Sequence, residues 1–306
     1  MTTTLAEPVA DDAGAALRTW RAFRRNPLGL PAVVIVLVLV LVGLCAPLIA
    51  HYPAGYGAAV LQAPSAAHWF GTDNLGRDIF AEVVWGTRVS MVVAVCASAL
   101  AIALGVLVAV IGAYFPALDG PVGVVVDLVL SLPVLPLMIL IAALAGPSLP
   151  VTVLVIALFS WPEVTRVVRS SALSVMPLPY MDAARVIGGT HRWIIRKHLL
   201  PAVAPVIVVS VVLTASRAVL SAAGLAFLGL SDAQSWSWGR ILFEAQQSGA
   251  MSSAWWTTLF PSLAILLLVV SATLLSIAYN DARDPRTRRR RRPARVPAAT
   301  TPTAED

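Results

Sequence analysis

Residues Tyr180–Pro201, YMDAARVIGGTHRWIIRKHLLP, form the largest polar insertion between strongly apolar segments of the sequence. The apolar runs on either side are long enough to cross a bilayer. We expect a short helix at the start of the stretch, ending at the Gly188-Gly189 pair, which permits a sharp turn. Thr190 is a suitable N-cap for a second helix over residues 190–199, which Pro201 should stop or kink. The pattern predicts two short helices that form a knob between two membrane spans.

Composition places the chain in a membrane. Its 306 residues include 58% hydrophobic and 12% charged residues, and the mean hydropathy is +0.82. Soluble domains carry about twice this charged fraction. We therefore expect an all-α, polytopic membrane protein. No nucleic-acid partner is expected, because the basic residues flank the apolar runs. Cys45 and Cys96 lie within apolar runs and are interpreted as small hydrophobic residues.

Six apolar runs approach or exceed the length of about 20 residues that a helix needs to cross the hydrocarbon core. They predict transmembrane helices at residues 28–50, 89–115, 122–145, 151–168, 202–225 and 255–279. The chain then divides into an N-terminal tail at 1–27, a six-helix membrane domain at 28–279 and a basic tail at 280–306. We expect residues 1–17 and the basic tail to be disordered.

The basic residues predict the orientation. Of 22 Lys and Arg, 18 fall before the first span, around the polar knob or in the C-terminal tail. Arg77, Arg88 and Arg240 fall on the other side. The positive-inside rule then places both termini in the cytoplasm. The run Arg288–Arg292 either binds anionic lipid headgroups of the bilayer or serves only as a solvated topology signal.

Several motifs together resemble a known family. Asp182-Ala183-Ala184 with Gly188, closing on Leu199-Leu200-Pro201, resembles the EAA loop of bacterial ABC-importer permeases, with Asp in place of the usual Glu. The alternative is an ordinary surface loop. The remaining matches narrow the resemblance to the C-type subunit of the dipeptide/oligopeptide/nickel branch: GTDNLGRDIF at 71–80, AFLGL at 226–230, SWG at 237–239, AWWTTLFP at 254–261 and DARDPR at 281–286.

The resemblance implies a fold, partners and a site. It implies the type I ABC-importer permease fold in a bacterial plasma membrane, with a sister B-type permease, two ATPase subunits and an extracytoplasmic solute-binding protein as partners. Peptides are the substrate class it favours, and nickel, haem or glutathione are the alternatives. We call residues 180–201 the coupling loop, because the resemblance implies that this loop contacts the ATPase. The residues carried over for that role are Asp182, Ala183, Ala184, Gly188, Leu200 and Pro201.

Two positions depart from the branch. An acidic residue usually precedes its S-F-L-G-L motif by a few positions, where this chain has Ala222. The Gly-Asp-Gly before its closing motif appears here as Ser276-Ile277-Ala278. The missing acids suggest a different chemistry of the translocation path, so the substrate follows less securely from the family than the fold does.

Arg217 and Asp127 are the charges that we place deepest in the predicted spans. Charged side chains in a membrane usually face a bundle interior or an aqueous path, so both are candidates for the translocation path. The alternatives are an internal partner for Arg217 and a place near the inner interface for Asp127. The outer Gly71–Asp78 segment either contacts a partner or caps the helix ends, with Arg77 and Asp78 as a stabilising pair.

No enzymatic chemistry is predicted. The four histidines do not have metal-ligand spacing, no nucleophile motif is present, and neither a metal site nor a cofactor site is predicted. Because the chain has no G-x-x-x-x-G-K-[ST] loop, we do not expect it to hydrolyse ATP. A secondary transporter is the alternative from another class, but it would require several intramembrane acids, of which we count only Asp127.

Overall fold

The computed structural model describes residue 23 and residues 26–283. Predictions for residues 1–22, for Arg24 and Arg25, and for the arginine run in the C-terminal tail lie outside the described residues. Within the described residues the secondary structure is helical, apart from an isolated bridge between Thr72 and Asp78. The elements in chain order are α2 (Gly29–Leu44), α3 (Ala46–Ile49), α4 (Ile79–Tyr114), α5 (Pro116–Ser131), α6 (Val134–Ala145), α7 (Leu149–Val175), α8 (Pro179–Val186), α9 (His191–Ile194), the π-helix η1 (Ile195–Leu199), α10 (Leu200–Phe227), α11 (Trp238–Gln247), α12 (Ala250–Ser253) and α13 (Trp256–Arg283).

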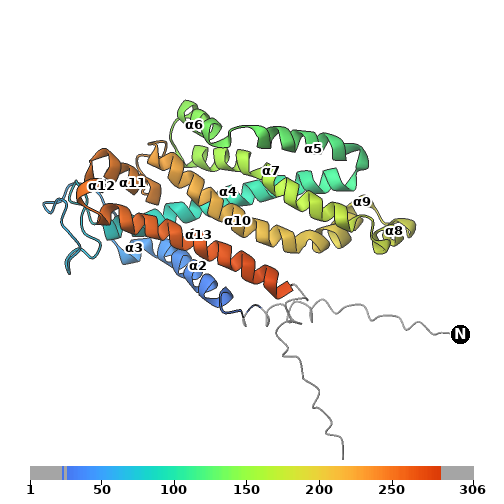
Figure 1. The fold of residues 1–306 in the computed structure, drawn as a ribbon, viewed down its shortest axis with the longest axis horizontal. Helices are drawn as coiled ribbons and strands as arrows, with labels where there is room; N and C mark the ends of the chain where they lie inside the picture. The colour runs from blue at the N-terminus through green and yellow to red at the C-terminus, as the bar shows by residue number, and fades with distance from the viewer. Residues whose placement is uncertain (1–22, 24–25, 284–306) are drawn as a thin grey trace, which may run out of the picture.

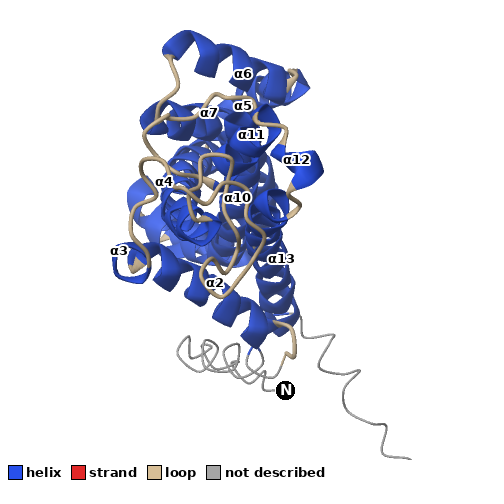
Figure 2. Ribbon diagram, turned by 90° about the vertical axis from the view of Figure 1, so that its left-hand side faces the viewer, coloured by secondary structure: helices blue, strands red, loops and turns tan. Residues whose placement is uncertain are grey.

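Helices α4, α7 and α10 form the centre of the bundle (Figure 1). The α5–α6 pair packs on α7, and α2 and α13 pack together along α4 and α10. The coupling loop, which contains α9 and nearly all of α8, lies at one end of the bundle (Figure 1). At the opposite end, loop segments and α11 cross the helix ends (Figure 2). We call residues 51–78 together with α11 the cap.

The six predicted spans take three forms. Four are single helices that are long and apolar enough to cross a membrane: α4, α7, α10 with its preceding residues, and α13. The third predicted span is the α5–α6 pair, which is bent by 80°. Pro133 lies in this break and cannot donate a backbone hydrogen bond. The first predicted span is the 16-residue helix α2, which is followed after Cys45 by the short helix α3. Pro47 of α3 likewise has no backbone N–H to donate.

Several boundaries differ from the sequence-based prediction. Helix α4 begins at Ile79, ten residues before the predicted start at 89, because the Asp78 carboxylate caps it by accepting a hydrogen bond from the backbone N–H of Phe80 at 3.0 Å. Helix α13 continues to Arg283. The first four residues of the predicted disordered tail are therefore helical, and Ala282 packs with Phe23 and Ala278 in a small cluster.

Small residues bring the central helices close together. A Cβ atom on Gly105 of α4 would lie 2.7 Å from the side chain of Val164 and 2.9 Å from the carbonyl oxygen of Trp161, both in α7. At the same crossing, the Thr165 hydroxyl donates a hydrogen bond to the Gly105 carbonyl at 3.0 Å. Such close packing is how membrane helices gain association energy without a hydrophobic driving force. It fixes α7, which leads into the coupling loop, against the longest helix of the bundle.

Candidate functional site

The turn of the coupling loop depends on Gly188. This residue has φ +81°, in the left-handed region that glycine enters without steric cost. The N–H of Gly188 donates to the Arg185 carbonyl at 3.0 Å, and the N–H of Gly189 donates to the Ala184 carbonyl at 3.1 Å. These two bonds are the Schellman arrangement that ends α8. The predicted sharp turn is present, and of the two glycines it is Gly188 that adopts the positive φ that this turn requires.

The second half of the loop begins as predicted and then differs. The Thr190 hydroxyl oxygen accepts a hydrogen bond from the backbone N–H of Trp193 at 3.4 Å and so caps α9. Pro201, however, does not stop the helix. Residues Ile195–Leu199 form a π-helical turn that leads directly into α10, with Pro201 within the first two positions of that helix. Pro201 lies just after the π-helical turn, where the regular i→i−4 hydrogen bonding of the α-helix is already interrupted. His191–Phe227 is thus one helical stretch of 37 residues.

One face of the coupling loop is anchored to the bundle. Met181, Ala184, Ile194 and Leu199 are buried in a cluster with the loop-side ends of α4 and α7. The Tyr114 hydroxyl lies 2.9 Å from Nδ1 of His191, which adds a polar contact between α4 and the loop. Of the two alanines carried over for contact with the ATPase, Ala184 packs inward and Ala183 is exposed.

The opposite face of the loop is exposed. Val186 and Ile187 at its tip are 86% and 75% exposed. Ala183 is also exposed, and Asp182 pairs with Arg185 at 2.7 Å on the same surface. An exposed apolar pair of this kind, beside polar residues, is typical of a protein contact site. Sequence reasoning missed both Val186 and Ile187, although two adjacent β-branched residues before a turn glycine were visible in the motif.

Arg217 lies in a groove between α7 and α10. It forms an ion pair with Glu163, which sequence reasoning missed as an intramembrane acid, although Glu163 lies near the middle of α7. The groove has a volume of about 320 Å³. Its lining includes Glu163, Val167, Val209, Ser210, Thr214 and Arg217.

Asp127 does not lie in this groove. It forms an ion pair with Arg166 of α7, and Asp119 likewise pairs with Arg169. Both pairs join α5 to the loop-side half of α7. The structure therefore does not bring the two predicted path residues together, and it gives Asp127 a partner within the bundle.

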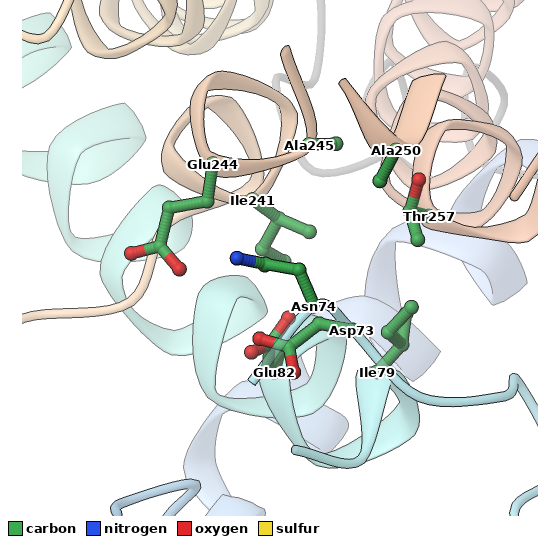
Figure 3. A pocket seen from close by; sticks show the side chains of 9 residues that line it. All are labelled: Asp73, Asn74, Ile79, Glu82, Ile241, Glu244, Ala245, Ala250 and Thr257. Atoms are coloured by element: carbon green, nitrogen blue, oxygen red, sulfur yellow. The ribbon is translucent and has the colours of Figure 1, made fainter. Parts of the chain in front are cut away.

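The cap contains a network of charged side chains. Asp73 accepts hydrogen bonds from the backbone N–H of Leu75 at 2.9 Å and of Arg77 at 2.7 Å. The Arg77 guanidinium pairs with Asp73, with the buried Glu82 at 3.3 Å and with Glu244 of α11. Burial lowers the pKa of Arg77, but these carboxylates outweigh that effect and leave its pKa above the ordinary value. Figure 3 shows the three carboxylates around one small cavity.

Tryptophans complete the cap. Arg77 and Arg240 each lie 4.6 Å from the ring of Trp236. The buried indole N–H of Trp238 donates to the Val83 carbonyl at 3.2 Å, and that of Trp256 donates to the Thr72 carbonyl at 3.1 Å. The predicted Arg77–Asp78 pair is wrong: Arg77 pairs with other acids, and Asp78 caps α4. Of the two readings of this segment, the structure supports a cap over the helix ends.

Comparison with known proteins decides the family. The family described as "Binding-protein-dependent transport system inner membrane component" matches residues 101–289. The chain belongs to this family. A second family, the "N-terminal TM domain of oligopeptide transport permease C", matches residues 17–64 of this inner membrane component. The sequence-based prediction of the C-type branch is thereby confirmed.

Curated relatives cover nearly the whole of this permease. A dipeptide transport system permease protein DppC of Alkalihalophilus pseudofirmus is 35% identical over 91% of this chain and 94% of the relative. The protein of the same name in Bacillus subtilis is 31% identical, and the match covers 88% of this chain and 85% of that relative. A glutathione transport system permease protein, GsiD, of Escherichia coli is 33% identical, and the match covers 87% of this chain and 89% of that relative.

The solved structures agree on the fold. The MetNI methionine ABC transporter, solved in inward-facing conformations, gives a TM-score of 0.54 at 20% identity, and the match covers 66% of this chain and 94% of that one. At this identity the likeness concerns the fold alone. It supports the predicted type I ABC-importer permease architecture, in which this permease is a multi-pass membrane protein.

Proposed function

We propose that this chain is the C-type permease subunit of an ATP-driven importer of short peptides. The curated relatives named as dipeptide permeases support the substrate class, because the chain matches them over almost its full length. The relative named as a glutathione transport system permease protein makes glutathione the alternative substrate. Nickel is less favoured, because the described lining of the groove around Arg217 holds no Cys, His or Met and offers only the Glu163 carboxylate as a metal ligand.

The observation that carries the mechanism is the continuity of the coupling loop with α10. The loop presents Val186 and Ile187 outward, while its other face is packed onto α4 and α7. Closure of two ATPase subunits would push this exposed face. The helical stretch that begins at His191 then transmits the displacement to Arg217 without an intervening hinge loop. The permease itself supplies movement and a lined path, and separate subunits hydrolyse ATP.

The proposed orientation puts the coupling loop in the cytoplasm and the cap outside. The sister B-type permease would complete the path, and the solute-binding protein would deliver peptide at the cap. Both termini would then be cytoplasmic, as the distribution of basic residues predicts.

One experiment tests the transport class. The chain is co-expressed with a B-type permease, ATPase subunits and a solute-binding protein from the same organism, and uptake of a labelled dipeptide is measured in cells. We expect uptake to stop on ATP depletion and to survive a protonophore. Uptake with the reverse dependence would establish a secondary transporter instead.

A second experiment tests the docking surface. We expect the double variant Val186→Ser, Ile187→Ser to lose the ATPase subunits on purification while the permease pair stays intact. Tyr56→Ser is the matched control, because Tyr56 is equally exposed but lies in the cap. Equal ATPase recovery from the loop variant and the parent would rule out docking at this tip.

The orientation is tested with cysteine reporters in a background without Cys45 and Cys96. Reporters at Ser65 and Ser248, both exposed in the cap, should react with a membrane-impermeant thiol reagent in intact cells. A reporter at Ala299 should react only after lysis. Labelling of the Ala299 reporter in intact cells would contradict the proposed orientation.

A further inference from the structure

The Glu163–Arg217 pair has features that a structural ion pair does not need. Both residues lie near the middle of long spanning helices, yet their side chains are 51% and 61% exposed. Charged groups at that depth are costly in lipid and are found where protein or water covers them. The surface that carries the pair is therefore not a lipid-facing surface.

The surroundings of the pair are built for a small polar solute. One side of the groove is apolar, with Val164, Val167 and Leu213, and Ser210 and Thr214 add hydroxyl groups beside the charges. Its volume of about 320 Å³ is at the lower end of the range for small-molecule sites. Neither residue of the Asp127–Arg166 pair, which is at least as exposed, is among the residues that line this groove.

We propose that Glu163 and Arg217 bind the two charged termini of a short peptide as it passes through the permease. This inference rests on the peptide substrate proposed above. The Arg217 guanidinium would take the carboxylate terminus, because its planar fork matches a carboxylate. Glu163 would take the ammonium terminus, the hydroxyl groups of Ser210 and Thr214 would face the peptide backbone, and the apolar side would accept the side chains.

The internal pair makes the site suitable for transport. A peptide with two free termini exchanges one protein ion pair for two protein–peptide pairs, so neither Glu163 nor Arg217 is left without a counter-charge. When the peptide leaves, the two side chains pair again. The free energy of binding is then only the difference between the protein–peptide ion pairs and the internal pair that they replace. This small difference gives the weak affinity that passage through the permease requires. A solute with only one charged terminus would leave either Glu163 or Arg217 unpaired.

The test measures occupancy of the groove directly. The complete transporter carries Val209→Cys, which places a thiol on the groove lining, with Cys45 and Cys96 replaced by Ala, and is assembled in lipid nanodiscs. We measure the rate at which a small aqueous maleimide reacts, with trialanine, trialanine amide or N-acetyl-trialanine present. Trialanine should protect the thiol, and each blocked peptide should require a concentration at least about tenfold higher.

The matched variant is Glu163→Gln, Arg217→Gln in the same background. Removing both charges leaves no unpaired charge, so a merely structural pair predicts normal assembly and unchanged protection. The proposed site predicts that protection by trialanine falls to the level of the blocked peptides, while recovery of the ATPase subunits is unchanged. Equal protection by all three peptides before and after the substitution would overturn the site.

Uptake of trialanine by the unmodified transporter separates this inference from the proposed function. Normal uptake without protection of the thiol introduced by Val209→Cys would overturn the site and leave the peptide function in place. Failure to take up trialanine or any labelled dipeptide, with uptake of another solute, would overturn the substrate class and the site together.

Discussion

The cap and the coupling loop look alike in sequence but differ in where their side chains point. Both are polar, glycine-containing insertions between apolar spans. In the cap, Arg77 and Arg240 meet carboxylates and the Trp236 ring inside the fold. In the coupling loop, Val186 and Ile187 remain largely exposed on the surface of the described chain. The difference teaches that a polar insertion is a candidate docking site when its fold leaves side chains such as this apolar pair exposed instead of packing them inside.

The same comparison can be made at two glycines by asking what an added Cβ atom would contact. Gly188 ends α8 and Gly229 follows α10, both with a positive φ near 80° and similar backbone hydrogen bonds. A Cβ on Gly229 would lie 3.1 Å from the Phe243 ring, whereas a Cβ on Gly188 would meet nothing within 4 Å. The same turn is therefore packed into the fold at the cap and open to solvent at the loop.

The largest effect is expected in the cap. Trp238→Ala removes a fully buried indole and its hydrogen bond to Val83, and we expect a loss of about 3–5 kcal/mol of stability. The measurement is the thermal aggregation midpoint of the purified complex, together with its abundance in the membrane. Trp69→Ala is the control, because Trp69 is 66% exposed. Equal losses for the two variants would mean that the cap is not a packed unit.

At Gly188 we expect a smaller loss of stability than at Trp238 but a complete loss of uptake. Gly188→Val forces a β-branched residue into a left-handed conformation at a local cost of about 1–3 kcal/mol, which should misdirect α9 and abolish uptake at normal abundance. Gly188→Asn should retain activity, because asparagine tolerates this conformation. Gly229→Val should instead reduce abundance. Normal uptake by Gly188→Val at normal abundance would contradict the coupling role.

The smallest structural effect is expected at Asp182. Its exposed pair with Arg185 contributes only about 0.2–0.5 kcal/mol to α8, so Asp182→Asn should weaken uptake moderately and Asp182→Lys should uncouple it without loss of membrane insertion. Adding Arg185→Glu to Asp182→Lys restores an internal pair of reversed sign. We expect no rescue if Asp182 meets a basic residue of the ATPase. Rescue of uptake would show that the internal pair alone matters.

Much of the architecture follows from the sequence, because the length of an apolar run responds directly to the thickness of the bilayer. The turn at Gly188 and the cap by Thr190 also follow, since both depend on local backbone chemistry. The start of α4 at Ile79 does not follow, because its first turns lie in a polar context that hydropathy assigns to a loop. The continuity through Pro201 was missed because the sequence does not indicate the π-helical turn at Ile195–Leu199, which precedes the proline within the continuous helix.

The site residues divide in the same way. Gly188 was found from its motif, whereas Glu163 was overlooked because the count of intramembrane acids stopped at Asp127. Only the packing of α7 against α10 places Glu163 opposite Arg217. The inward direction of Ala184 is also a tertiary result, since the sequence motif shows small residues but not which of them faces the bundle.

We expect the stretch His191–Phe227 to act as a lever that turns about its cap end. Its 37 residues make it ~55 Å long, and its cap end is clamped where Gly239 lies so close to α10 that a Cβ would fall 2.5 Å from the Ala223 carbonyl oxygen. A tilt of ~5° about that clamp would sweep the loop end by ~4 Å but move the backbone at Arg217, six residues from Ala223, by only ~1 Å. We expect a wide displacement at the loop to become a short one at the groove that holds the Glu163–Arg217 pair.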